Sequence, residues 1–189
     1  HFCGLRSDST IWCQGENSDD QLGHDWSGKV SAPSPVLPPS GDWLSGSAGA
    51  EGGCGIGVNR TLWCWGTNSH GSAGQGDTVM HPFPLQVGSV TTWRSVSVGS
   101  TNACAIRTDD SLWCWGDATT GQLGIAGATG DVTSPSAGPA GSWSSVSLGW
   151  AHACGIKTAG TAGDAAAAFD SVRSGAAREG RGARRSQLD

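Results

Sequence analysis

The sequence has no tyrosine, a single methionine and only 14% charged residues. Its formal net charge of -5 offers no basic surface that could neutralise phosphates, which argues against nucleic-acid binding. No apolar run approaches the roughly 18 to 20 residues of a membrane-spanning helix. We therefore expect neither a nucleic-acid partner nor a membrane span in these residues.

The residue patterns of common catalytic and metal sites are also missing. The glycine-rich stretch 121–130 lacks the Gly-x4-Gly-Lys-Ser/Thr arrangement that binds phosphates, and no run has the acidic spacing of a calcium loop. His152, Cys154 and Asp164 include the residue types of a nucleophile set, but nothing evident beside Cys154 would lower the pKa of its thiol. We expect a non-enzymatic protein without a metal or cofactor.

What the sequence does contain is a repeat, with 31 glycines and 10 tryptophans among its 189 residues. Its clearest copy is 93–116, WRSVSVGSTNACAIRTDDSLWCWG, followed by the turn-rich 121–124. A shift of about 50 residues in either direction aligns it with further copies that begin at Trp43 and Trp143. Short strand-like runs and glycine turns at this period are typical of a β-propeller with one four-stranded blade per repeat.

The repeat predicts an all-β propeller fragment of about three blades. Its expected parts are a partial blade at 1–42, complete repeats at 43–92 and 93–142, the start of a broken repeat at 143–160, and a low-complexity tail at 161–189. Asp164 stands where the fourth copy should have its second cysteine. We expect the tail to be disordered, and interpret it as the result of a truncation, a frameshift or a mistaken gene model.

Six of the seven cysteines form pairs with the spacing C-x9-C, and each pair flanks a strand, polar tip, strand pattern. A tip of roughly three residues would place the two cysteines opposite each other across a hairpin, close enough for a disulfide. We predict three disulfides and a free thiol at Cys154, which indicates an oxidising compartment. Reduced, buried cysteines are the alternative, and zinc is disfavoured because the short C-x2-4-C spacing is absent. The predicted pairs are Cys3 with Cys13, Cys54 with Cys64, and Cys104 with Cys114.

Features that the copies do not share are candidates for function. Trp26 and Trp150 have no counterparts in the other copies, so they are candidates for contact with a partner. Asn59 begins the sequon Asn-Arg-Thr at a predicted hairpin tip and is a possible glycosylation site. Prolines are expected to mark connections: the segment 31–40 should be a connection or an edge, and Pro82 and Pro84 should lie in the crossing between blades.

Four motifs in fixed order resemble the repeat of the regulator of chromosome condensation family. They are Trp-x2-Val-Ser-x-Gly, Ala-Cys-Ala-Ile-Arg-Thr-Asp, Leu-Trp-Cys-Trp-Gly and Gly-Gln-Leu-Gly, and the resemblance extends from residue 1 to about residue 158. It implies a propeller that closes with seven repeats, of which this chain supplies about three. The cysteine-rich variant looks like that of secreted or surface-exposed members, including the ectodomains of crinkly-type plant receptor kinases.

The founding member of that family is a nuclear exchange factor for a small GTPase that binds chromatin, while others bind protein partners, so the fold alone does not identify a partner. We expect a non-enzymatic protein-interaction scaffold from an exported or cell-surface protein, with loops 18–39, 68–84 and 117–140 as its contact surface. The alternatives are a nuclear or cytoplasmic exchange factor or chromatin-binding regulator, and a carbohydrate-binding module.

Overall fold

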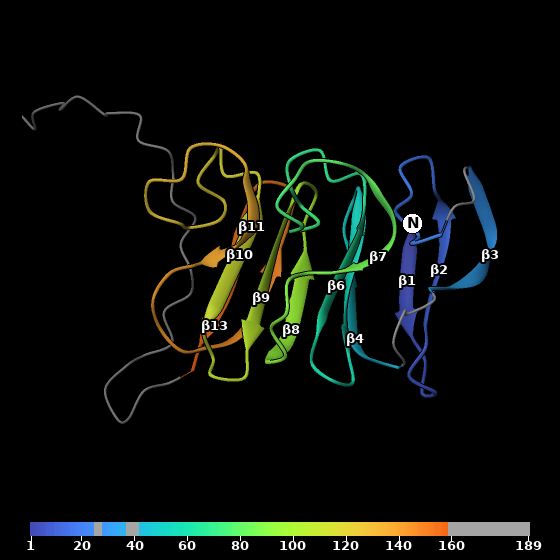
Figure 1. Cartoon of the computed structure of the whole chain (residues 1–189), viewed down its shortest axis with the longest axis horizontal. Coiled ribbons are helices and arrows are strands. Elements are labelled where there is room, and N and C mark those ends of the chain that lie inside the picture. The colour runs from blue at the N-terminus through green and yellow to red at the C-terminus, as the bar shows by residue number, and fades with distance from the viewer. Residues whose placement is uncertain (25–27, 37–41, 159–189) are drawn as a thin grey trace, which may run out of the picture.

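The computed structural model describes residues 1–24, 28–36 and 42–158, and within them all regular structure is β-strand. The strands form four antiparallel sheets that lie side by side along the long axis of the molecule (Figure 1). This confirms the predicted partial propeller. Trp26 and the tail 161–189 lie outside the described residues. No helix able to cross a membrane occurs in the described part of the chain.

Each sheet follows the chain as a simple meander. The first sheet contains β1 (Phe2–Leu5), β2 (Ile11–Glu16) and β3 (Lys29–Val36). The second contains β4 (Trp43–Ala48), β5 (Gly52–Gly57), β6 (Leu62–Gly66) and β7 (His81–Gln86). The third contains β8 (Trp93–Val98), β9 (Asn102–Arg107), β10 (Leu112–Gly116) and β11 (Val132–Ala137), and the fourth contains β12 (Trp143–Leu148) and β13 (Ala153–Lys157).

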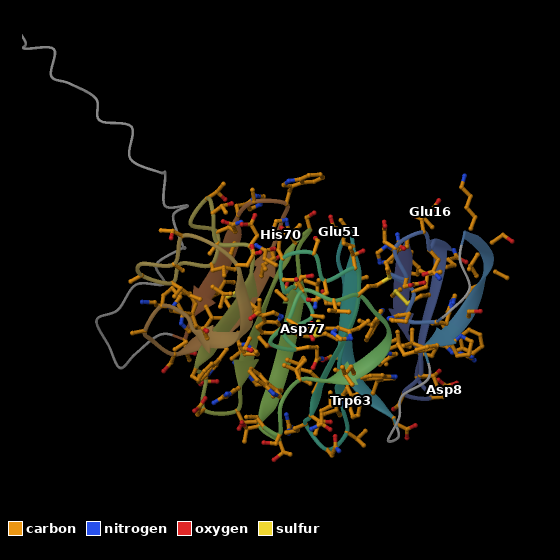
Figure 2. All side chains as sticks on the ribbon, turned by 45° about the horizontal axis from the view of Figure 1, so that its top comes forward. Asp8, Glu16, Glu51, Trp63, His70 and Asp77 are labelled. Atoms are coloured by element: carbon orange, nitrogen blue, oxygen red, sulfur yellow. A yellow bond between two sulfur atoms is a disulfide. The ribbon has the colours of Figure 1, made fainter. Side chains whose placement is uncertain are left out.

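The meander sorts the connections onto two opposite ends of the molecule. Turns after the first strand and loops after the third strand of a complete sheet share one end, which we call the loop end: 16–24, 49–51, 67–80, 99–101, 117–131 and 149–152. Hairpin tips between the second and third strands lie at the other, the tip end: 6–10, 58–61 and 107–111. Figure 2 shows Glu16, Glu51 and His70 on one side of the molecule, and Asp8 and Trp63 on the opposite side.

Several prolines lie within strands, although Pro139 lies in the crossing between the third and fourth sheets. Pro82 and Pro84 are part of β7, so the expectation that they mark the crossing between blades was wrong. The predicted edge at 31–40 is strand β3 as far as Val36, and the rest of that segment lies outside the described residues. Both strands are outermost in their sheets. Their outer side needs no ladder hydrogen bonds, which is why proline is tolerated there.

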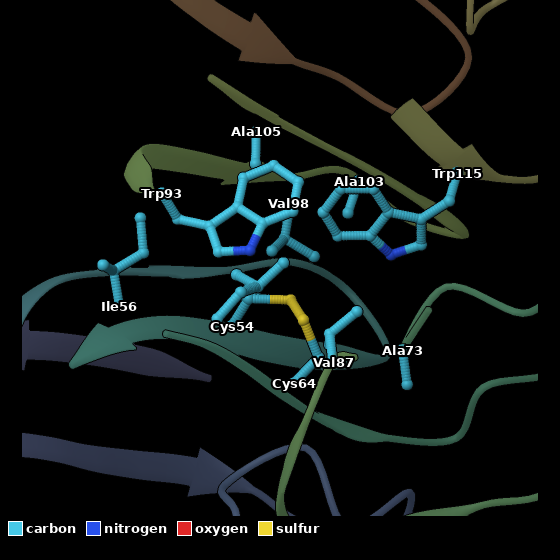
Figure 3. Close-up of a cluster of buried hydrophobic side chains, with 11 residues drawn as sticks. Cys54, Ile56, Cys64, Ala73, Val87, Trp93, Val98, Ala103, Ala105 and Trp115 are labelled. Atoms are coloured by element: carbon cyan, nitrogen blue, oxygen red, sulfur yellow. A yellow bond between two sulfur atoms is a disulfide. The ribbon is translucent and has the colours of Figure 1, made fainter. Parts of the chain in front are cut away.

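Neighbouring sheets are joined through the tryptophan that begins each copy. Trp93 is 1% exposed, and Figure 3 shows its indole against the Cys54–Cys64 disulfide of the preceding sheet. Its backbone N–H donates to the carbonyl of Arg60 at the tip of that sheet, at 3.1 Å. Trp143 makes the same bond to Asp110, at 2.9 Å. Since a buried indole removes about 150–250 Å² of surface from water, these residues are central to the stacking of sheets.

The second tryptophan of the Leu-Trp-Cys-Trp-Gly run accounts for a glycine within a loop of the preceding sheet. Trp115 donates its indole N–H to the carbonyl of Ser72, at 2.8 Å. Gly74 has φ +70°, and a Cβ there would lie 3.0 Å from the Trp115 Nε1. Trp65 and Gly23 repeat the arrangement one sheet earlier. These glycines therefore do two things: they allow the chain to turn, and their lack of a Cβ leaves room for an indole from the next sheet.

Candidate functional site

The structure joins the six paired cysteines as three hairpin disulfides. Cys104 lies directly opposite Cys114 in the β9–β10 ladder, with their Cα atoms 4.1 Å apart. Cys54 with Cys64 and Cys3 with Cys13 occupy the same register positions. The sulfur atoms of the inner sheets belong to the apolar clusters between sheets, so these disulfides are structural cross-links and offer no accessible reactive site.

Cys154 is the one free cysteine of the described residues, and it is exposed on β13. It occupies the position of Cys104 in the repeat, but the strand that would carry a partner cysteine is not among the described residues. The side chain of neighbouring His152 lies against the Gly149 backbone, where an added Cβ would be 2.3 Å from its ring. Nothing in this geometry activates the thiol as a nucleophile.

The hairpin tips share a turn built from three side chains. The Oδ1 of Asn59 accepts hydrogen bonds from the Thr61 hydroxyl at 2.6 Å and from its backbone N–H at 3.3 Å. The Thr61 Oγ1 in turn accepts from the indole N–H of Trp63, at 2.8 Å. Asp8 and Asp109 stand in the place of Asn59 and make the same bonds with Thr10 and Ser111. The sequon thus has a structural role, although its attachment atom Nδ2 takes no part in these bonds and Asn59 is exposed.

A cation packs on the strand tryptophans close to the tip end. The guanidinium of Arg107 lies 3.7 Å from the ring centroid of Trp113 and 4.8 Å from that of Trp93. Burial lowers the pKa of Arg107, although an arginine stays charged at any physiological pH. The first and fourth sheets have a cation at the same repeat position: Arg6 lies 5.1 Å from the ring centroid of Trp12, and Lys157 lies 5.2 Å from that of Trp143. The second sheet has Gly57 there, so the cation–π contact recurs in three of the four described sheets.

Trp150 is the most exposed large apolar residue among those described, at 78%. It lies at the loop end, in the turn between β12 and β13. The same position holds Ala50 in the second sheet and Ser100 in the third. An indole at this position is therefore not needed for packing between sheets. This is why Trp150 is a candidate for contact with a partner.

The loop end also brings together polar groups from two sheets. His70, from the loop after β6, pairs with Asp131 just before β11, and the Nδ1–Oδ1 distance is 2.9 Å. Ligand atoms of His70, Asp117 and Asp131 all lie within 4.8 Å of one another, an arrangement that could hold a metal ion. The hydrogen bond to Asp131 is the main reason that the pKa of His70 lies above its usual value, and Asp117 and Glu51 raise the pKa further.

Sequence reasoning did not identify this group. His70, Asp117 and Asp131 do not recur at the repeat period, and they come from loops of different sheets. The only signal was indirect: their segments belong to the loops that differ between copies, which were expected to form the contact surface. Those segments also contain strands β3, β7 and β11, so the variable loops are shorter than the expected ranges.

Comparison with protein-family models identifies one copy of the repeat. Residues 93–122 match the family model of the regulator of chromosome condensation (RCC1) repeat. A search of curated proteins gave no match to the chain.

Solved structures share the fold at low sequence identity. Human WBSCR16 superposes with a TM-score of 0.73 at 16% identity, over 82% of this chain and 42% of that protein. Prp20p from Saccharomyces cerevisiae, described together with its binding properties to Gsp1p and histones, gives 0.72 at 19% identity, over 83% of this chain and 42% of that one. The ectodomain of the Physcomitrella patens receptor kinase CR4 gives 0.52 at 20% identity, over 88% and 38%. The chain thus spans about two fifths of each.

Proposed function

We propose that this chain is part of a β-propeller built from regulator of chromosome condensation repeats, and that it is a non-enzymatic scaffold whose loop end contacts a protein partner. The observation that carries the proposal is Trp150, whose indole is exposed at a position where the other sheets have Ala50 and Ser100. Residues shared by the copies pack the sheets, whereas the residues peculiar to one copy gather in the loops. Such loops on a rigid framework are the usual site of partner choice.

The loop end is held in place by bonds between sheets, which suits a preformed contact surface. The backbone N–H of Ala50 donates to the Gly99 carbonyl of the next sheet, at 3.1 Å. The N–H of Val98 donates to the Ser47 hydroxyl, at 3.0 Å, and Leu148 repeats this bond with Ser97. A surface fixed in advance loses little conformational entropy on binding.

Site-specific photocrosslinking tests the proposal. A benzophenone amino acid replaces Trp150 or Thr119 at the loop end, and Val58 at the tip end serves as the matched exposed control. We expect discrete protein adducts from the two loop-end positions, suppressed by excess unlabelled chain, and none from Val58. Adducts that form equally at Val58, or carbohydrate adducts at Trp150, would contradict a protein-binding loop end.

An exported location is the second part of this proposal. Its support is the three disulfides, together with the exposed sequon at Asn59. Thiol counting on denatured, unreduced protein isolated from its native source should give one free thiol, at Cys154, and a count of seven would refute the proposal. Removal of N-glycans should lower the mass at Asn59, and an Asn59→Gln variant should show no such change.

The competing functions make different predictions. An exchange factor would accelerate release of a fluorescent GDP analogue from a Ras-type GTPase, and we expect no acceleration by this chain. A carbohydrate-binding module would bind a glycan array in a manner lost in Trp150→Ala, and we expect no glycan binding. Prp20p shares only the fold with this chain, which spans 42% of it, so its binding properties are not transferred.

A further inference from the structure

The turns and loops of the loop end form one continuous surface across three sheets. The Ala50 N–H bonds to Gly99, and a Cβ on Gly99 would lie 2.6 Å from the Gly149 carbonyl, so the turns that carry Glu51, Thr101 and Trp150 adjoin in a row. Glu51 accepts a hydrogen bond from the Ser69 hydroxyl at 3.0 Å, beside His70. The backbone N–H of Asp117 donates to the Thr101 carbonyl, at 3.0 Å. We call Glu51, His70, Asp117, Asp131 and Trp150 the loop-end patch.

Charge is sharply separated between the two ends of the molecule. In the described ranges the loop end carries many carboxylates, and Lys29 is the one lysine or arginine there; the carboxylates are Glu16, Asp19, Asp20, Glu51, Asp77, Asp117 and Asp131. All the described arginines and Lys157 lie toward the tip end, where they are Arg6, Arg60, Arg94 and Arg107. The net charge of -5 in the composition therefore conceals a strongly anionic end opposite a nearly balanced one.

The ion pairs follow the same division. At the tip end, Arg94 pairs with Asp110 at 3.0 Å and Arg6 pairs with Asp8 at 3.6 Å. At the loop end, the ion pairs that involve described residues join carboxylates to histidines, as in His70 with Asp131. Permanent positive charge thus compensates the tip end but not the loop end.

Trp150 adds a recognition element that acid side chains alone lack. An exposed indole face attracts lysine and arginine side chains, and the chain already uses this contact internally, where the Arg107 guanidinium stacks on Trp113 at 3.7 Å. An exposed indole beside carboxylates that no lysine or arginine neutralises favours the binding of a cationic polypeptide. It disfavours nucleic acid and anionic membranes, which the carboxylates would repel.

We propose that the loop-end patch docks a lysine- and arginine-rich segment of a protein partner, with Trp150 stacked against one of its cations. This inference rests on the proposed scaffold function and names the chemical class of its partner. Ion pairs with Glu51, Asp117 and Asp131 would guide the segment into place, and the binding would weaken as salt screens these charges.

Fluorescence anisotropy with the full chain tests the inference. The probe is a fluorescein-labelled peptide of alternating lysine and serine, and its counterpart has glutamate in place of lysine. Glu51→Gln/Asp131→Asn is compared with Asp42→Asn/Asp110→Asn, which removes the same charge at the tip end and likewise breaks one ion pair. We expect the loop-end variant to raise the Kd for the lysine peptide about tenfold, the tip-end variant to change it less than twofold, and Trp150→Ala to raise it about fivefold.

Three results would overturn the inference: equal weakening by the two double variants, equal binding of the glutamate peptide, or loss of binding on addition of EDTA. The last would mean that a divalent ion occupies His70, Asp117 and Asp131 and governs the surface. The outcome is separable from that of the scaffold proposal. Protein adducts at Trp150 without lysine-peptide binding would refute only the partner class, whereas lysine-peptide binding without adducts would refute the scaffold proposal.

Discussion

The inner second and third sheets and the outer first and fourth sheets share the sequence repeat, but equivalent side chains differ in burial. Ile106 of β9 and Ile56 of β5 are 0% exposed, while Leu5 of β1 and Ile156 of β13, at the same position in the repeat, are 45% and 57% exposed. Every residue of β5 is buried, whereas β1 has none that is fully buried. The strand sequence supplies the apolar side chain, and a neighbouring sheet on each face supplies its burial.

The inner sheets and the first sheet also differ in the residue that follows the second hairpin cysteine. Trp65 and Trp115 are 3% and 0% exposed in the inner sheets, each with its indole seated on a loop of the preceding sheet. The first sheet has Gln14 at that position, so this indole contact belongs to the two inner sheets and is not shared by every copy of the repeat.

The largest contrast is expected from truncating the equivalent isoleucines. Ile106→Ala should lower the free energy of unfolding by about 2–5 kcal/mol, because it leaves a cavity between the third and fourth sheets. Ile156→Ala should change it by less than about 0.5 kcal/mol, because the side chain is already mostly in water. Urea unfolding monitored by tryptophan fluorescence measures both, and equal losses would show that the two positions are buried alike.

The disulfides should give the next largest effect and a smaller contrast. Each closes a loop with a sequence separation of 10, so removing any one frees the unfolded chain to the same degree, worth about 2–4 kcal/mol. Both disulfides pack against the following sheet, but Cys3 is only partly buried while Cys104 and Cys114 are both buried, so Cys104→Ala/Cys114→Ala should cost more than Cys3→Ala/Cys13→Ala. Unfolding of the two double variants under identical non-reducing conditions checks the order, and a greater loss at the first sheet would reverse our account of the inner core.

Replacing a glycine that packs against an indole should destabilise the fold more than replacing a glycine that only allows a turn. Gly74 has φ +70° and meets Trp115, while Gly121 has φ +77° and nothing within 4 Å of an added Cβ. Gly121→Ala should cost about 1 kcal/mol for its backbone conformation alone. Gly74→Ala should cost about 2 kcal/mol, since Trp115 must also shift. Thermal unfolding of both variants distinguishes the two roles. Equal shifts in Tm would show that contact with the Trp115 indole does not add to the cost at Gly74.

The sequence was sufficient to predict the structural features that recur in each copy of the repeat. Trp93, Cys104 and Cys114 each fall on copies about 50 residues away, so strand order and cysteine pairing follow from the period and from hairpin symmetry. The prediction that Pro82 and Pro84 lie in a crossing between blades failed because a motif comparison treats residues between motifs as connections. Pro82 and Pro84 instead occupy β7, an edge strand whose pairing depends on β6 and not on a pattern of its own.

The loop end could not be predicted in the same way. His70 meets Asp131 only because the loop after β6 folds against the start of β11, where an added Cβ on Gly71 would lie 2.6 Å from the Thr133 Cα. That contact depends on how two sheets stack, which no spacing within one copy encodes. The exposure of Trp150 was predictable in part, since the absence of a counterpart in other copies already separated it from the packing tryptophans.

The smallest effect is expected at the junction of the two inner sheets, where His70 makes it sensitive to pH. The pKa of His70 is raised in the folded state, chiefly by its hydrogen bond to Asp131, so the folded chain holds this proton more tightly than the unfolded chain. The pair therefore stabilises fully below the unfolded pKa of about 6.5, and this stabilisation is lost as pH rises through the folded pKa. The effect is small because both side chains are partly exposed.

Asp131→Asn should flatten the dependence of unfolding free energy on pH above 6.5, measured by urea titration. Asp77 pairs with His81 within one sheet, so Asp77→Asn serves as the control for a generic loss of charge. An unchanged slope in Asp131→Asn would show that the His70 proton does not link the two sheets.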